Sequence, residues 1–473
     1  MQDFTSAPDP RTAPPHHDPL PNEPRTELGY ARRLIHVYGN WLRYVPAWRR
    51  WLVWNGTCWA RDDTGQAARW AKVIARCLTT EALAIPDDKQ RANAMRDARR
   101  GESSAGVAGV LTLASTEDGI AVSPDDLDAD PWLLNCANGT VDLRTGQLRD
   151  PDPSDLLTKV TGAAYRPEAV SAEWIRFLER VQPEPAMRRF LARLVGHSLE
   201  GRIVEHLLPI FHGEGANGKG TFIGAVLAAL GDYADAADPE LLTARTFDAH
   251  PTGVADLYRV RLAVLHEGDA GRRLAEGTVK RLTGGDRLKA RRMREDFWHF
   301  EPSHTFVVLT NHRPIVTGTD EGIWRRLRLI PWPVVVPADE RDEHLTERLK
   351  LAAEAVLAWI VAGYHDWREH GLGEPDTVTA ATDAYRGEND AVGRFLSEMC
   401  VVSPAASVRS AELYGGWSKW AADEGEDPGT AKAFTTALTN RGYGPPTRTN
   451  RGALWRGIGL RVHLDAADRS DGW

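Results

Sequence analysis

The sequence contains few cysteines and no long apolar segment. Its four cysteines are too far apart for the paired spacing of a zinc site, so we expect free thiols in a reducing compartment. No apolar run reaches the ~18 residues of a membrane-spanning helix, and the first residues lack the basic, apolar and small-residue order of a signal peptide. These absences predict a cytoplasmic protein with no membrane partner. The cysteines are Cys58, Cys77, Cys136 and Cys400.

The charge of the chain is acidic overall and strongly basic in one segment. The 58 Lys and Arg against 66 Asp and Glu give a net charge of −8 over 473 residues. Between Arg272 and Arg294, however, nine Lys or Arg accompany only Glu276 and Asp286, a local balance of +7. We expect a polyanion to bind this segment, and the alternative is a solvated helix face.

Composition and periodicity divide the first 199 residues into a tail and a module. Residues 1–26 are rich in proline and poor in large apolar residues, which predicts a disordered tail. In 27–199 we expect an α+β module with a hairpin at Asn55-Gly56, helices in 66–113, a second hairpin at Asn138-Gly139, and helices in 174–199.

The segments after residue 337 return to a helical pattern. The pattern of apolar residues in 338–390 predicts helices, centred on 344–367. In 391–473 two helical clusters, 391–422 and 430–442, precede a basic segment typical of a two-stranded wing. Helix, helix and hairpin is the order of a winged helix, which makes 391–473 a candidate DNA-binding domain. A plain helical cap is the alternative.

The segment HGEGANGKGTF fits the phosphate-binding pattern G-x-x-x-x-G-K, in which glycines turn backbone N–H groups toward a triphosphate. It follows a strand candidate at 207–211 and precedes a helix candidate at 221–230, the context that this motif requires. Lys219 would reach the β and γ phosphates of the nucleotide. The nucleotide-binding residues are expected to be Gly213, Glu214, Gly215, Ala216, Asn217, Gly218, Lys219, Gly220, Thr221 and Phe222.

One position departs from this pattern. The residue after the lysine is Gly220 instead of the Ser or Thr that usually holds Mg²⁺, and Thr221 follows it. Either Thr221 supplies the hydroxyl, which we favour, or water and a carboxylate hold the metal. ATP and Mg²⁺ are the expected cofactors.

Polar side chains at the ends of two further strand candidates complete the predicted site. Glu267 follows the apolar run 261–265 directly and is the preferred acid for Mg²⁺ and the attacking water, whereas Asp269 has a structural alternative as a cap of the next turn. Asn311 follows the run 305–309 and can sense the γ-phosphate. Beyond it, Arg325 and Arg326 are candidates to stabilise phosphate charge from a neighbouring subunit.

The order of five motifs resembles the superfamily 3 helicases of the phage and plasmid primase-helicase family, which is related to the poxvirus replicative helicase-primase. Residues 200–337 carry the match, and the module before them resembles this family more weakly. The motifs are GEGANGKGTF, RLAVLHEGDAG, VKRLTGGDRLKARRM, FVVLTNHRPIV and DEGIWRRLRLIPW.

The resemblance implies an α/β fold with an AAA+-like P-loop ATPase core that assembles into a ring, commonly a hexamer, and pulls single-stranded or forked DNA with 3′ to 5′ polarity. It makes Lys219, Glu267, Asn311, Arg325 and Arg326 catalytic, and Thr221 and Glu267 metal ligands. The segment 280–292 would form a pore hairpin, with Phe297 and Trp298 available for base stacking or core packing. Its DNA-binding residues would be Lys280, Arg287, Lys289, Arg291 and Arg292.

These features favour an ATP-driven replicative helicase of a phage, plasmid or integrated element, with other replication proteins as possible partners. The short stretch before the helical module leaves no room for a primer-synthesis domain, so we expect no primase site. An ATP-switched initiator or loader without processive unwinding is the main alternative. A small-molecule P-loop kinase is disfavoured by the basic segment and the paired arginines.

Overall fold

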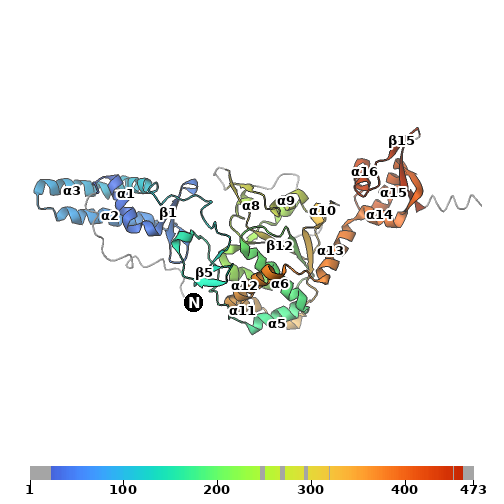
Figure 1. Ribbon diagram of the computed structural model, residues 1–473, viewed down its shortest axis with the longest axis horizontal. Coiled ribbons are helices and arrows are strands. Elements are labelled where there is room, and N and C mark those ends of the chain that lie inside the picture. The colour runs from blue at the N-terminus through green and yellow to red at the C-terminus, as the bar shows by residue number, and fades with distance from the viewer. Residues whose placement is uncertain are drawn as a thin grey trace, which may run out of the picture.

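The computed structural model describes residues 23–244, 251–266, 272–291, 297–318, 320–450 and 452–461, with side chains omitted at 251 and 252. Figure 1 shows a helical unit at one end, a sheet-containing core in the middle and a small domain at the other end. Among the described residues, no helix has the length and apolar character needed to cross a membrane. The four cysteines are free, as expected.

The N-terminal unit combines a helical bundle with a small antiparallel sheet. Its apolar core is separate from that of the rest of the chain and joins α1, α2 and α4 through residues such as Leu34, Trp70 and Val110. The hairpin at Asn55-Gly56 is confirmed, with Gly56 at φ +96° between β2 and β3. The elements are α1 (Glu27–Tyr38), β1 (Leu42–Val45), β2 (Arg50–Trp54), β3 (Trp59–Arg61), α2 (Gln66–Leu83), α3 (Asp88–Gly101) and α4 (Ser104–Ala114).

A second three-stranded sheet follows, and the predicted turn at Asn138-Gly139 joins its first two strands. A side chain at Gly139 would meet the carbonyl of Arg149 at 2.4 Å, so this position requires glycine. Two helices then lead to the core. The elements are β4 (Leu133–Cys136), β5 (Gly139–Asp142), β6 (Gln147–Arg149), α5 (Ala172–Val181) and α6 (Pro185–His197).

The core contains a five-stranded parallel sheet in the order β13-β7-β12-β9-β8. Because all strands run in the same direction, their carboxyl ends meet at one edge of the sheet, where open α/β sheets bind ligands. The strands are β7 (Leu208–His212), β8 (Ala234–Ala237), β9 (Leu262–His266), β12 (Thr305–Thr310) and β13 (Leu327–Pro331). The accompanying elements are α7 (Lys219–Leu230), α8 (Pro251–Ala255), α9 (Glu276–Leu282), β10 (Leu288–Ala290), β11 (Trp298–Phe300) and α10 (Glu321–Trp324).

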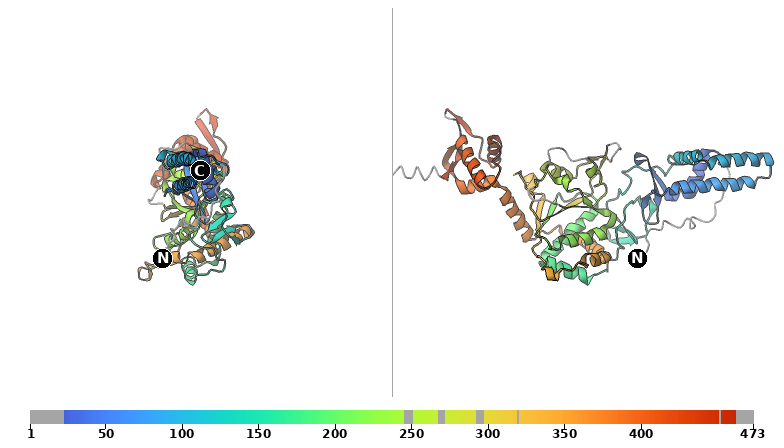
Figure 2. Two further views of the ribbon diagram at one scale, coloured as in Figure 1. Left: turned by 90° about the vertical axis from the view of Figure 1, so that its left-hand side faces the viewer. Right: turned by 180° about the vertical axis from the view of Figure 1, so that it is seen from behind.

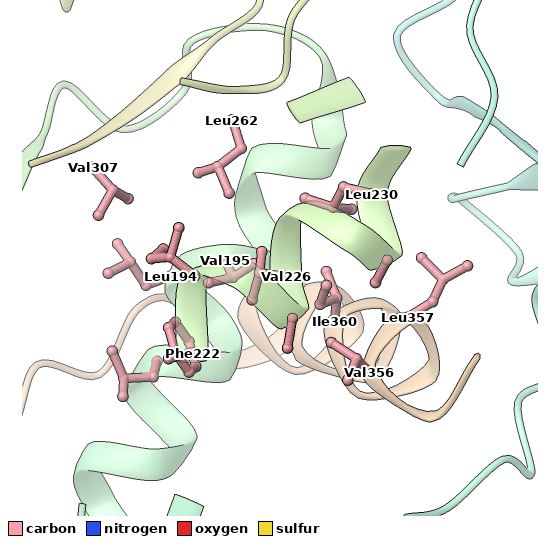
Figure 3. Close-up of a cluster of buried hydrophobic side chains, with 14 of the residues drawn as sticks. Leu194, Val195, Phe222, Val226, Leu230, Leu262, Val307, Val356, Leu357 and Ile360 are labelled. Atoms are coloured by element: carbon pink, nitrogen blue, oxygen red, sulfur yellow. The ribbon is translucent and has the colours of Figure 1, made fainter. Parts of the chain in front are cut away.

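Helices cover both faces of this sheet, and the strand residues alternate between two apolar clusters. Along β12, Val307 and Leu309 pack on one face and Phe306 and Val308 on the other. Figure 3 shows the first cluster, in which α7 lies among α6, α12 and the sheet. Its labelled side chains are Leu194, Val195, Phe222, Val226, Leu230, Leu262, Val307, Val356, Leu357 and Ile360.

The predicted boundaries at 199 and 337 lie inside this core rather than between units. Helices α5 and α6 before the first boundary and α12 after the second share one apolar cluster with α7. At the contact of α6 and α12, a side chain at Gly196 would meet the Tyr364 nitrogen at 2.3 Å, and one at Gly363 would meet the Ala192 oxygen at 2.2 Å. The helices after the sheet are α11 (Leu345–Leu351), α12 (Ala353–His370) and α13 (Asp376–Asn389).

The C-terminal domain has its own apolar core, built around Phe395, Trp417 and Trp455. The helical cluster predicted for 391–422 contains two helices, but strand β14 separates them, which the prediction missed. This strand pairs with β16, which lies some fifty residues later in the chain. The elements are α14 (Ala391–Met399), β14 (Cys400–Arg409), α15 (Ser410–Asp423), α16 (Ala431–Asn440), β15 (Thr447–Thr449) and β16 (Gly452–Leu460).

Candidate active site and basic hairpin

The loop 213–218 joins β7 to α7 at the carboxyl edge of the sheet, as the sequence predicts. Ala216 and Gly218 have positive φ, +56° and +85°, and a side chain at Gly218 would lie 2.6 Å from a methyl of Val181. Such left-handed residues turn backbone N–H groups into an anion-binding concavity, and the amino terminus of a helix adds partial positive charge. This loop therefore offers donors to a phosphate group.

Lys219, the first residue of α7, is a buried cation beside this loop, with 6% of its surface exposed. Its Nζ donates to the carbonyl of Gly213 at 2.6 Å and to Oδ1 of Asn311 at 3.1 Å. Burial lowers the pKa of Lys219 to about 8. Because no carboxylate of the described residues pairs with it, this ammonium group lacks a counter-charge that an anion can supply.

A pocket of about 370 Å³ lies beside this lysine. Its walls combine the loop and the first turn of α7 with His266 at the end of β9 and Thr310 and Asn311 at the end of β12. The predicted acid Glu267 comes directly after His266, but Glu267 and Asp269 lie outside the described residues. The structure thus brings the loop, Lys219 and Asn311 together at one edge.

Thr221 lies on the wall of this pocket and of a second one. Its hydroxyl is 3.2 Å from that of Thr346 on α11, so α11 contacts the start of α7 here. The second pocket, of about 460 Å³, lies across the loop and is lined by Phe177 and Val181 of α5. Its charged walls include Arg176, Arg180, Arg341 and Arg348. We did not expect this pocket from the sequence, because its walls come from segments well before and well after the motif.

The two paired arginines occupy different environments. Arg326 is buried, and its guanidinium donates to the hydroxyl of Thr283 at 3.2 Å and to the carbonyl of Gly322 at 2.5 Å. Arg325 is exposed. Both precede β13, whose first residue Leu327 pairs with the first residue of β7, so they lie at the edge of the sheet opposite the loop 213–218.

The basic segment forms a hairpin further along the chain than 280–292. Lys280 lies in helix α9, where Val279 and Leu282 are buried, and its Nζ pairs with Asp320 at 2.8 Å. Residues 284–286, near the middle of 280–292, connect α9 to β10 and are not the tip of a hairpin. The antiparallel pair is β10 with β11, in register at Lys289 and His299.

This hairpin presents cations around an exposed aromatic ring. The Phe297 side chain is 48% exposed, with Lys289 Nζ 4.5 Å and the Arg291 guanidinium carbon 4.9 Å from its ring centroid. Trp298 instead packs against Tyr258 and Phe300. Arg287 is exposed just before β10, and Arg292 lies outside the described residues. Of the two aromatic candidates, Phe297 is therefore the one available for stacking.

Two family models match the chain. Residues 31–183 match a family described as D5 N terminal like, and residues 211–326 match a family of unknown function, DUF5906. The first covers most of the N-terminal unit with β4–β6 and α5, and the second runs from the end of β7 through the loop 213–218 to Arg326.

Several curated viral proteins are similar to this chain. A protein named "Putative helicase" of Acanthamoeba polyphaga mimivirus is 27% identical over 329 residues, which are 64% of this chain and 34% of the viral protein. A "Putative helicase" of Frog virus 3 is 23% identical, over 63% of this chain and 39% of its own. A "Putative primase" of African swine fever virus is also 23% identical, over 62% and 34%. The chain spans little more than a third of these relatives.

The fold also resembles solved structures. Two apo structures of the NrS-1 C-terminal region cover 93% of this chain and all of their own, with TM-scores of 0.50 and 0.51 and 11% identity. At that identity the likeness concerns the fold alone. The two family models and the viral relatives show that this chain belongs to the phage and viral primase-helicase family.

Proposed function

We propose that the chain is an ATP-driven replicative DNA helicase that assembles into a ring and moves 3′ to 5′ on single-stranded DNA. The position of Lys219 carries this proposal: it is buried at the carboxyl end of β7, contacts Asn311 at the end of β12, and has no described acidic partner. The relatives named as helicases and primases support a role in replication.

The site suits ATP. The loop 213–218 and Lys219 would hold the phosphates, and Thr221 and Glu267 would hold Mg²⁺, which neutralises phosphate charge during transfer to water. Asn311 contacts Lys219 and would orient the γ-phosphate or the attacking water. The apolar side chains Phe177 and Val181, across the loop, offer a surface for the base. The predicted AAA+-like core is supported by this site and by the sheet order.

A shared active site is favoured by the position of Arg325. The strand β13 separates this residue from the carboxyl edge by five residues, ~16 Å at 3.3 Å per residue, so its guanidinium cannot approach the phosphates of its own subunit. In a ring with head-to-tail contacts, however, each interface joins one side of a subunit to the opposite side of the next subunit. Arg325 would then complete the neighbouring site, whereas Arg326 is held by Thr283 and Gly322 within its own chain.

The hairpin of β10 and β11 is suited to single-stranded DNA. Unpaired bases stack on aromatic rings, and cations beside the ring neutralise the backbone. Phe297 with Lys289 and Arg291 provides both contacts on one exposed element. At the other end of the chain, the order helix, strand, helix, helix, two strands supports a winged-helix domain in 391–461.

Strand displacement tests this proposal. We expect the chain with ATP and Mg²⁺ to separate a duplex with a 3′ tail and to leave one with a 5′ tail intact. The Lys219→Ala variant is the control and should separate neither. Nucleotide-dependent DNA binding without displacement would contradict the proposal and support an initiator or loader instead.

A further inference from the structure

We propose that helices α2 and α3 of the N-terminal unit form a binding surface for the backbone of duplex DNA. Figures 1 and 2 show these two helices side by side, projecting away from the central sheet. The surface is defined by the exposed cations Arg69, Lys72 and Arg76 of α2 and Lys89, Arg96 and Arg100 of α3, and is called the α2–α3 surface below.

The charge of the N-terminal unit contrasts with that of the chain. Residues 23–114 hold fifteen Lys or Arg and nine Asp or Glu, a net charge of +6, in a chain whose total is −8. The remaining residues therefore carry −14. Such a segregation of charge attracts a polyanion to the basic unit and orients the molecule before contact.

The cations lie in a stripe on each helix. Lys89, Arg96 and Arg100 are spaced by seven and four residues, and Arg69, Lys72 and Arg76 by three and four, so each set shares one helical face. The opposite faces are buried, at Ala94 and Ala98 in α3 and at Trp70, Ile74 and Leu78 in α2. The stripe on α3 extends over ~16 Å at 1.5 Å per residue, several phosphates of a duplex strand.

Within the described part of the chain, none of these six cations forms an ion pair, although other arginines of the same unit do. Arg33 pairs with Glu81 at 2.8 Å, and Arg91 pairs with Asp88. A surface that served only solubility could carry paired acids and cations, whereas a surface that binds an anion needs cations without acidic partners. The acids present on α3 are Asp88, which is already paired, and the partly buried Asp97.

The absence of exposed rings favours a duplex over a single strand. Trp70 is the one aromatic residue between 66 and 101 and is only 8% exposed. Single strands are held by base stacking as well as charge, whereas the bases of a duplex are already stacked and offer mainly phosphates. The β10–β11 hairpin has the opposite composition, with Phe297 exposed between its cations. The two surfaces therefore suit the two forms of DNA at a fork.

The test compares binding of duplex and single strand without hydrolysis. In the full chain, Lys89, Arg96 and Arg100 are replaced together by Ala, which preserves helix propensity. The matched control replaces Arg144, Arg166 and Lys350, three exposed cations that are paired with acids elsewhere, and changes the net charge equally. Affinity for a blunt 30-base-pair duplex and for a 30-base single strand is measured across a salt series, with the mass of the assembly in parallel.

We expect the α3 variant to bind duplex at least tenfold more weakly, with the slope of log affinity against log salt smaller by about 2.7, because each lost phosphate contact removes ~0.9. Single-strand affinity, ATP turnover and assembly mass should match the control. An unchanged duplex slope would overturn the proposal, as would an equal loss on single strands. A changed assembly mass would overturn it by making the surface a subunit contact. If the unaltered chain does not hydrolyse ATP, the proposed helicase is refuted. The comparison of duplex binding between the α3 variant and its control would still hold.

Discussion

At the scale of single residues, the burial of Lys219 should make the proposed nucleotide binding sensitive to pH. Its pKa is lowered to about 8, so the free site loses its cation as the pH rises above that value, and only the charged form attracts phosphate. We expect ATP affinity to fall up to about tenfold per pH unit above 8. Titration with a fluorescent ATP analogue from pH 7 to pH 9 measures this. The Lys219→Arg variant stays charged, so an equally steep decline in that variant would contradict the explanation.

The two adjacent arginines should differ when each is removed. We expect Arg325→Ala to retain its fold and its nucleotide affinity but to lose about 10³-fold in turnover, because the exposed guanidinium would act on a neighbouring site. Arg326→Ala removes the donor to the Thr283 hydroxyl and to the Gly322 carbonyl at a buried site, so this variant should have a lower melting temperature. Turnover assays and thermal unfolding separate the effects. Wild-type turnover in Arg325→Ala would contradict the assignment.

Two buried histidines should make the fold sensitive to acid. Burial lowers the pKa of His197 and of His304 to about 4, whereas unfolding returns both to their ordinary value. The unfolded chain therefore binds more protons below pH 6.5, and the free energy of unfolding should fall between pH 6.5 and 4 by up to about 3 kcal/mol per histidine. Urea unfolding at pH 7.5 and pH 5 checks this. An equal free energy of unfolding at pH 7.5 and pH 5 would show that these two histidines do not control the acid sensitivity of the fold.

At the scale of elements, the sequence was sufficient where a local pattern defines the structure. The loop 213–218 with its flanking strand and helix, and the turn at Asn55-Gly56, depend on residues adjacent in the chain, and the positions of all of them were predicted. Strand β14 was not, because its pairing partner β16 is remote and Pro404 interrupts its strand pattern. The contact of Gly196 with α12 and the pocket beside Phe177 also depend on distant segments.

In the hairpin of β10 and β11, the aromatic ring and the cations should contribute to single-strand binding in different ways. Phe297→Ala should weaken single-strand binding by about 1–3 kcal/mol for each stacked base. Replacing Lys289 and Arg291 with Ala should instead reduce the salt slope by about 1.4 per subunit, because each phosphate contact contributes ~0.7. Phe297→Tyr is the control that keeps a ring. If Phe297→Ala binds as tightly as that control, the ring does not contact bases.

At the scale of the whole molecule, the proposed function depends on how far apart the fold places residues of the active site and of the basic surfaces. Lys219 and Arg325 lie at opposite edges of one sheet, and the net charge is positive in the N-terminal unit and in the segment 272–294, although the whole chain is acidic. The sequence indicated these residues but not their separation. That separation supports the proposal that a single subunit has an incomplete active site.

Mixing two inactive variants tests this claim most directly. By the proposed mechanism, Lys219→Ala would lack the phosphate contact and Arg325→Ala would lack the group supplied to the neighbour, so each should be nearly inactive alone. In a randomly mixed ring about a quarter of the seams combine an intact Lys219 with an intact Arg325. We predict that an equimolar mixture regains about that fraction of wild-type ATP turnover. A mixture no more active than its separate components would contradict the shared site.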